Sequence, residues 1–290
     1  MTDSAQSGIS DISESSLMTF IDSRREHAVH LIDAQKLIAD LVTVHSNAGK
    51  NLNFFRELII YATLLTALLK KGERLSVYFD NTEPDFKFKV ETGFDGNTRC
   101  LLLPEGLTEF PAVYTGKLRV IKFNPESKTP YTSVTEIEES TSRKLGETLM
   151  NTLYQLPGFL SVSDLVDFGA LVIRLPLPEK ENSVNSDTIK NTQTGFAESV
   201  LTIASSNYAD KGKLISEIAS DDLKFLAERN IQYSCDCSEE RVMLSLCMLP
   251  DFEVEEEFKH SDPIGMNCDY CKTSYSISGA NFNDFKRKLN

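Results

Sequence analysis

The last sixty residues of the chain contain five of its six cysteines, and four of these five form two close pairs. The pairs read Cys235-Asp-Cys237 and, after thirty intervening residues, Cys268-Asp-Tyr-Cys271. A structural zinc site takes four ligands tetrahedrally, and two cysteine pairs brought together by folding can supply them. The segment is poor in large apolar residues, so a bound metal would add stability that a small core lacks. The pattern predicts a zinc ion held by Cys235, Cys237, Cys268 and Cys271.

The chemistry of these sulfurs favours a redox switch over a purely structural site. Zinc keeps cysteine sulfurs as thiolates, the form that oxidants attack. The two sulfurs of either pair can close a disulfide, which no longer serves as a thiolate ligand, so oxidation would expel the metal. Because metal-binding energy is folding energy in such modules, loss of the metal would unfold the segment. A constitutive zinc-stabilised protein-interaction module without a switch is the alternative that remains open.

A thiol oxidoreductase that uses Cys268-x-x-Cys271 is a third function that the motif permits. Thioredoxin-like chemistry requires this motif at a helix N-terminus within a βαβ unit. The residues KTSYSIS after Cys271 are instead typical of a strand or turn. The sequence also contains no GxSxG elbow, no phosphate-binding glycine loop and no dinucleotide fingerprint. These observations favour a binding protein that is not an enzyme.

Charge and hydropathy restrict the partners and the location. The formal net charge of −13 repels nucleic-acid phosphates and anionic membrane surfaces. The longest uncharged apolar stretch, 58–69, has twelve residues, against the ~20 that a membrane-spanning helix needs. Residues 1–16 contain neither Lys nor Arg and no apolar signal-peptide core, which predicts a disordered acidic tail and a cytoplasmic location. In a reducing cytoplasm, clustered thiols are metal ligands or redox groups rather than permanent disulfides.

Hydrophobic periodicity predicts an α+β fold in which helices pack on a mixed sheet. Apolar residues three and four positions apart predict an apolar, core-buried helix over 53–71 and a second helix around Leu145, Leu149 and Leu153. Strands are predicted at 75–79, 86–90, 118–123 and 170–175, with a hairpin turn at Asp95-Gly96. The predicted segments are the acidic tail (1–16), an N-terminal α+β domain (17–178), a metastable linker (179–230) with one or two short helices up to about Glu228, and a zinc-binding redox-switch domain (231–290).

The remaining cysteines and two histidines have structural interpretations. Cys247 lies in a predicted helix over 239–249 and is expected to be a buried small hydrophobe. Cys100 is expected in a strand interior. His27 and His30 are spaced for one helix face, where surface or hydrogen-bonded histidines are more common than metal ligands.

The cysteine motif and its surroundings resemble a known family. Cys235-Asp-Cys237-Ser-Glu-Glu-Arg, followed by Cys268-x-x-Cys271 and Tyr275, is similar to the zinc-binding end of the bacterial 33-kilodalton heat-shock proteins. These are redox-regulated holdase chaperones. The stretch LLTALLKKGERLSVYF resembles a helix and the following strand of that family. The chain departs from the family pattern at Glu83-Pro84, where Gly-Pro is expected, and at Phe168-Gly169-Ala170, where paired glycines are expected.

The resemblance implies a mechanism in which the reduced, zinc-bound form is inactive. Oxidation, usually with unfolding stress, would form the disulfides Cys235–Cys237 and Cys268–Cys271 and release zinc. The C-terminal module and the linker would then unfold and expose apolar surface that binds unfolding client proteins without ATP. The resemblance further implies a homodimer in the active state and transfer of clients to ATP-dependent foldase chaperones.

Overall fold

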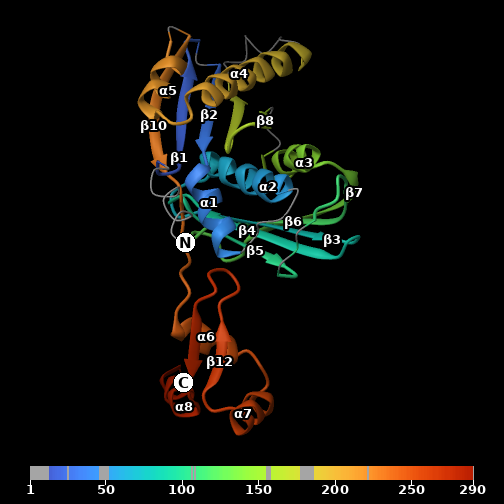
Figure 1. The fold of residues 1–290 in the computed structure, drawn as a ribbon, viewed down its shortest axis with the longest axis vertical. Helices are drawn as coiled ribbons and strands as arrows, with labels where there is room; N and C mark the ends of the chain where they lie inside the picture. The colour runs from blue at the N-terminus through green and yellow to red at the C-terminus, as the bar shows by residue number, and fades with distance from the viewer. Residues whose placement is uncertain are drawn as a thin grey trace, which may run out of the picture. The chain divides into compact units, whose positions relative to one another are not determined.

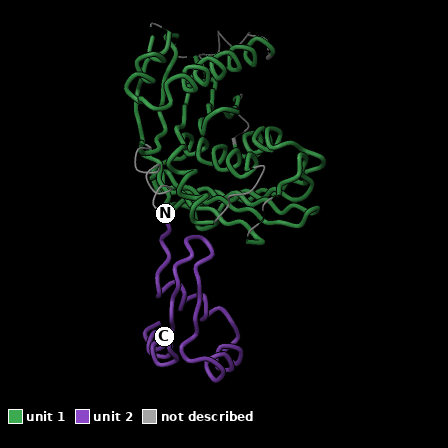
Figure 2. Tube along the Cα trace, viewed as in Figure 1, with its two compact units in different colours: residues 1–233 green, residues 234–290 purple. Residues whose placement is uncertain are grey.

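The chain folds into two compact units, Met1–Tyr233 and Ser234–Asn290 (Figure 2). The computed structural model describes residues 13–24, 26–45, 52–105, 107, 109–154, 158–176, 186–220 and 222–289. Most of the predicted tail, residues 1–12, and the start of the predicted linker, residues 179–185, lie outside these ranges. The predicted domain boundary at 230/231 precedes the division between the units by three residues, because Gln232 and Tyr233 still pair with a strand of the first unit.

Two sheets organise the first unit (Figure 1). Sheet A has the strand order β10-β1-β2-β9-β8, formed by Leu223–Asn230, Ser16–Asp22, His27–Asp33, Phe168–Arg174 and Gly158–Val162. Sheet B has the order β11-β5-β4-β3-β6-β7, formed by Gln232–Tyr233, Asn97–Leu103, Phe86–Gly93, Arg74–Asn81, Tyr114–Phe123 and Tyr131–Ser140. All pairings are antiparallel except that of β11 with β5. The predicted α+β class is therefore confirmed, and the four predicted strands correspond to β3, β4, β6 and β9.

A helix between the two sheets forms the centre of the main core. α2 (Asn53–Leu64) continues as the 3₁₀ turn η1 (Leu65–Leu68), so the predicted helix is present but ends earlier than expected. α2 contacts β2, β8 and β9 of sheet A, β4 of sheet B, and α3 (Ser142–Tyr154). The side chains of α2 are apolar around most of its circumference because other elements of the protein pack against these sides. The expected burial of the helix is confirmed. The Phe54 ring lies 4.2 to 5.8 Å from five aromatic rings of the sheet B side, those of Phe79, Phe86, Phe88, Phe110 and Tyr114.

Two further helices, α4 (Ser186–Asn207) and α5 (Lys211–Ile218), cover the other face of sheet A. This second core is formed by Met18, Phe20, Val29, Leu31, Phe168, Ala170, Val172 and Leu223 of the sheet together with Ala197, Val200, Leu201, Ala204, Leu214 and Ile218 of the two helices. Apart from its edge strand β10, sheet A is thus buried on both faces, by α2 with α1 (Gln35–Val44) on one side and by α4 with α5 on the other.

The predicted linker contains α4 from Ser186 onward, because the apolar residues that anchor this helix come later in it. Two local predictions in this unit are wrong. Residues 223–228, predicted as the end of a helix, belong to strand β10, since β1 offers them a partner edge. His27 and His30 lie on β2 rather than on a helix, and both are buried.

The second unit is small and has a small core. Its elements are α6 (Glu239–Leu246), α7 (Asp251–His260), the hairpin β12 (Ile264–Asn267) and β13 (Ser274–Ile277), and α8 (Gly279–Leu289). Five apolar side chains are buried at its centre: Met243, Leu246, Val254, Ile277 and Phe282. The helix predicted over 239–249 ends at Leu246, and Cys247 follows it as a half-buried residue instead of a fully buried one. Across the described parts of both units, no helix combines the length and apolar character needed to span a membrane.

Candidate metal centre

Two backbone segments of the second unit bring the four predicted cysteines together. Cys235 and Cys237 lie in the extended chain just before α6, whose N-cap, Ser238, accepts a hydrogen bond from the backbone N–H of Arg241. This cap and the ion pair between Asp236 and Arg241, at 2.6 Å, fix the chain on either side of Cys237. The first cysteine pair is therefore positioned by the start of a helix.

The second pair lies in the turn of the β12–β13 hairpin. The Cys268 N–H donates to the Thr273 carbonyl at 2.9 Å, and the Lys272 N–H donates to the Cys268 carbonyl at 2.7 Å. Lys272 has a φ of 61°, in the left-handed region, which closes the turn immediately after Cys271. The turn thus brings both sulfurs of this pair to the same end of the hairpin.

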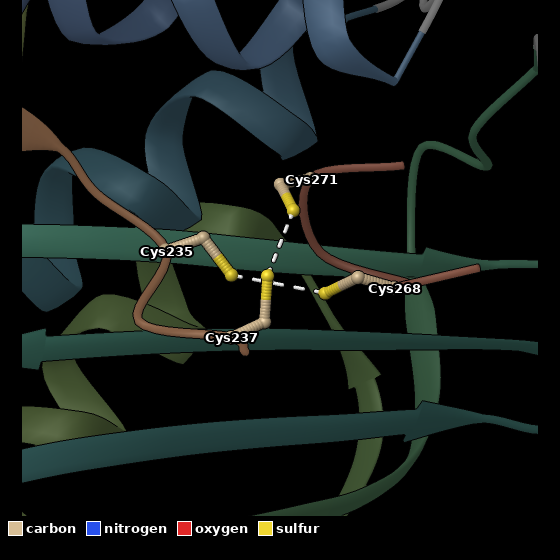
Figure 3. A group of neighbouring side chains, drawn as sticks. All are labelled: Cys235, Cys237, Cys268 and Cys271. Atoms are coloured by element: carbon tan, nitrogen blue, oxygen red, sulfur yellow. Dashed lines mark hydrogen bonds between the residues drawn. The ribbon is translucent and has the colours of Figure 1, made fainter. Parts of the chain in front are cut away.

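The four sulfurs form a compact cluster (Figure 3). All four Sγ atoms lie within 4.8 Å of one another, with 3.7 Å between Cys235 and Cys268 and 3.3 Å between Cys237 and Cys271. A regular tetrahedron with Zn–S bonds of ~2.3 Å has edges of about 3.8 Å. The cluster therefore has the size of a tetrahedral metal site, and four thiolates are a donor set that soft or borderline metals prefer.

Neighbouring hydroxyl groups form hydrogen bonds with two of the sulfurs. The Tyr275 hydroxyl donates to Cys237 Sγ at 2.9 Å, and this hydrogen bond raises the pKa of Tyr275 to about 12. Burial raises the pKa of Cys237. Burial acts in the same direction on Cys271, but hydrogen bonds with the side chain and backbone of Thr273 and with the sulfurs of Cys237 and Cys268 outweigh it and bring the pKa of Cys271 to about 6. Near neutral pH, Cys271 is therefore mainly a thiolate, the form that binds metal.

The sequence predicts the four cysteines of the cluster but not all of the residues that contact them. Thr273 was missed, although a hydroxyl residue two positions after the last cysteine is the signal that would have found it. Cys247 is not a member of the cluster. Cys100 is fully buried on β5, as predicted. Among the described residues, no other group of histidines, cysteines and carboxylates is arranged to hold a metal.

The fold and the site together define a class: two-unit α+β proteins whose small C-terminal unit carries a four-cysteine cluster that could hold a metal ion. The sequence model of one family, described as Hsp33 protein, matches residues 15–278. The chain therefore belongs to the Hsp33 family, a family of chaperones and not of enzymes, which implies binding to unfolded client proteins.

Individual relatives agree with this assignment. The 33 kDa chaperonin of Enterobacter sp. (strain 638) is 25% identical over 230 residues, 76% of this chain and 77% of that protein. The 33 kDa chaperonin of Pectobacterium atrosepticum is 24% identical over 257 residues, 84% and 86% of the two chains. The crystal structure of a 33 kDa chaperonin from Thermotoga maritima has the same fold, with a TM-score of 0.71 at 17% identity over 96% of this chain and 99% of that one.

Proposed function

We propose that this chain is a redox-regulated, ATP-independent holdase chaperone that is inactive while Cys235, Cys237, Cys268 and Cys271 are reduced and hold Zn²⁺. The observation that carries the proposal is the cysteine cluster, placed in a unit with five buried apolar side chains at its core. A core of this size gives little stability by itself, so the state of the sulfurs decides whether the unit folds.

In the reduced state the four sulfurs act as ligands. Bound zinc would keep all of them as thiolates and join the two backbone segments of the site. The Tyr275 hydroxyl and Thr273 orient and stabilise the sulfurs of Cys237 and Cys271 through their hydrogen bonds. Such outer partners raise the affinity of a site for its metal.

In the oxidised state the sulfurs pair with each other. An oxidant such as peroxide accepts two electrons for each disulfide formed and becomes two molecules of water after taking up two protons. The proposed disulfides are Cys235–Cys237 and Cys268–Cys271, each within one of the two backbone segments. Neither disulfide crosses between the segments, so oxidation removes the link that zinc provides, and we expect the unit to unfold.

The surface that binds clients is proposed to lie under α4 and α5. These helices belong to the segment predicted as a metastable linker, and they cover fully buried side chains of sheet A such as Phe20, Leu31 and Phe168. Departure of the helices would expose this apolar sheet face. An exposed contiguous apolar patch is the feature by which an unfolding protein would be held without ATP.

The remaining parts of the proposal concern partners and location. We propose a homodimer as the active state, transfer of clients to ATP-dependent foldases, and a cytoplasmic location where the thiols are kept reduced. The net charge of −13 supports binding to proteins rather than to nucleic acid.

The test is to treat the reduced, zinc-loaded chain with peroxide at mildly raised temperature. We expect release of one zinc per chain, a fall in free thiols by four from the six cysteines present, and suppression of client aggregation in a light-scattering assay. Cys247→Ser is the matched control, because this half-buried cysteine lies outside the cluster. Oxidised protein that has lost zinc but does not slow aggregation of several clients would refute the proposal. Cysteines that resist the oxidant would support a constitutive zinc-stabilised module instead.

A further inference from the structure

Residues 229–233 tie the two sheets of the first unit together, and we call this segment the clasp. Its first two residues end β10 at the edge of sheet A, where Arg229 pairs with Leu17 of β1. Its last two residues form β11, which pairs in parallel with the start of β5 at the edge of sheet B. A single stretch of backbone therefore belongs to the edges of both sheets. Cys235 follows the clasp after one intervening residue.

The side chain of Arg229 is the first fastening point of the clasp. Its two terminal nitrogens donate to the Phe94 carbonyl at 2.8 Å and to the Thr66 carbonyl at 2.9 Å. The guanidinium also lies over the Phe94 ring, 4.8 Å from its centroid. Burial lowers the pKa of Arg229, and the charge of Asp95 partly offsets this effect. A half-buried cation from the edge of sheet A is thus bonded to the β4–β5 turn and to η1.

Gly96 is the second fastening point. It has a φ of +81°, and a Cβ at this position would lie 2.1 Å from the carbonyl oxygen of Asn230. Its own carbonyl accepts a hydrogen bond from the Gln232 N–H at 3.1 Å. Between these contacts, the side chain of Ile231 is buried in the main core. Only glycine allows the clasp to approach the hairpin turn this closely.

The strand that the clasp secures has little packing of its own. In β10 only Leu223 is buried, and the next five residues are exposed, including Phe225 at 38% and Leu226 at 57%. At its other end, the clasp adds half-buried Arg229 as the last but one residue of β10 and buried Ile231 directly after the strand. The helices α4 and α5 precede β10 directly in the chain, so β10 anchors the end of the layer that covers sheet A.

We propose that the clasp sets the threshold at which α4, α5 and β10 leave sheet A, with Arg229 and Gly96 as its fastening points. This inference rests on the proposed holdase function. Because the second unit follows Tyr233 immediately, unfolding of that unit frees the C-terminal end of the clasp. β11, with only two paired residues, is then the first element to detach. The contacts of Arg229 determine how far the detachment spreads.

The experiment compares Arg229→Met and Gly96→Ala with two matched controls in the full-length, reduced, zinc-loaded chain. Arg119→Met removes another arginine that lies over an aromatic ring, that of Tyr78, but outside the clasp. Gly72→Ala carries the same backbone strain, at a φ of +83°, and meets the side chain of Pro125 instead. Both clasp variants should exchange amide hydrogens of β10 and β11 at least about tenfold faster than the controls.

The clasp variants should also suppress client aggregation at a lower peroxide concentration or temperature, with zinc content and thiol count before oxidation unchanged. Amide exchange of β10 and β11 at the control rates in both variants would refute the proposed role of the clasp. Faster exchange with an unchanged activation threshold would refute it as well. If amide exchange in α2 also becomes faster in Arg229→Met, that variant has destabilised the main core. The comparison of Gly96→Ala with Gly72→Ala then decides whether the clasp secures β10. Oxidised wild type that holds no client would refute the holdase function itself, whereas the exchange rates would still show whether the clasp fastens β10.

Discussion

Gly195, in the middle of α4, offers a way to strengthen the layer that we propose must leave sheet A. A Cβ at this position would meet nothing within 4 Å, so Gly195→Ala introduces no clash. Alanine is more favourable than glycine in a helix interior by about 0.8–1.0 kcal/mol. At about 1.4 kcal/mol per factor of ten, this gain lowers the population of opened α4 about fivefold. The substitution touches neither the cysteines nor the clasp.

Amide hydrogen exchange in α4 should therefore slow about fivefold in the reduced variant. Activation by peroxide at a fixed mild temperature should slow as well, measured by the time at which client aggregation is first suppressed. Gly265→Ala is the control, because a Cβ there also meets open space but lies on β12 of the second unit. Unchanged exchange in α4 would refute the helix argument. Slower exchange with unchanged activation would show that departure of α4 is not part of the switch.

Two further predictions concern single side chains. Tyr275→Phe removes the hydroxyl that donates to Cys237, so zinc affinity should fall about 10- to 100-fold in competition with a chromophoric chelator; Tyr131→Phe is the control, and equal affinities would contradict the assigned role. Burial and the charge of Arg229 lower the pKa of His30 to about 4. Just below pH ~6.5 only the unfolded state takes up a proton at this histidine, so the free energy of unfolding decreases as the pH is lowered. Between pH 7 and ~5.5, wild type should lose about 1 kcal/mol relative to His30→Asn in urea unfolding. Burial raises the pKa of Asp33 to about 6, which changes stability in the opposite direction, but this contribution is the same in wild type and in His30→Asn and cancels in the comparison. A difference in unfolding free energy between the two proteins that does not change with pH would contradict the prediction.

The features best predicted from the sequence are those that depend on residues close together in the chain. The two cysteine pairs lie in short segments that fold around their own turns and caps, so spacing alone placed the four sulfurs in one cluster. The helix at 53–64 was found because its apolar residues repeat at helical spacing. Its burial on all sides followed from the same residues, since only protein on every side accommodates such a surface.

Among the strands of sheet A, only β9 is predicted from the sequence. The strands β1 and β2 were not predicted, because sheet A is covered on both faces and β2 is buried along its whole length, which removes the alternation that marks a strand. The two histidines of β2 added a false helical spacing. β10 was read as helix because its residues carry no strong strand preference and pair only where β1 offers an edge.

The sequence alone determined the four-cysteine cluster, the α+β class and the central apolar helix, because each depends on side chains close together in the chain. Only the tertiary structure decided that polar residues near 190 begin a packed helix, that residues 223–230 form an edge strand, and that Arg229 and Gly96 fasten this strand to a second sheet. The edge strand and its fastening depend on partners more than a hundred residues away, as between β10 and β1 or between Arg229 and Phe94. Local propensity contains no information about such contacts, which exist only when both sheets are in place.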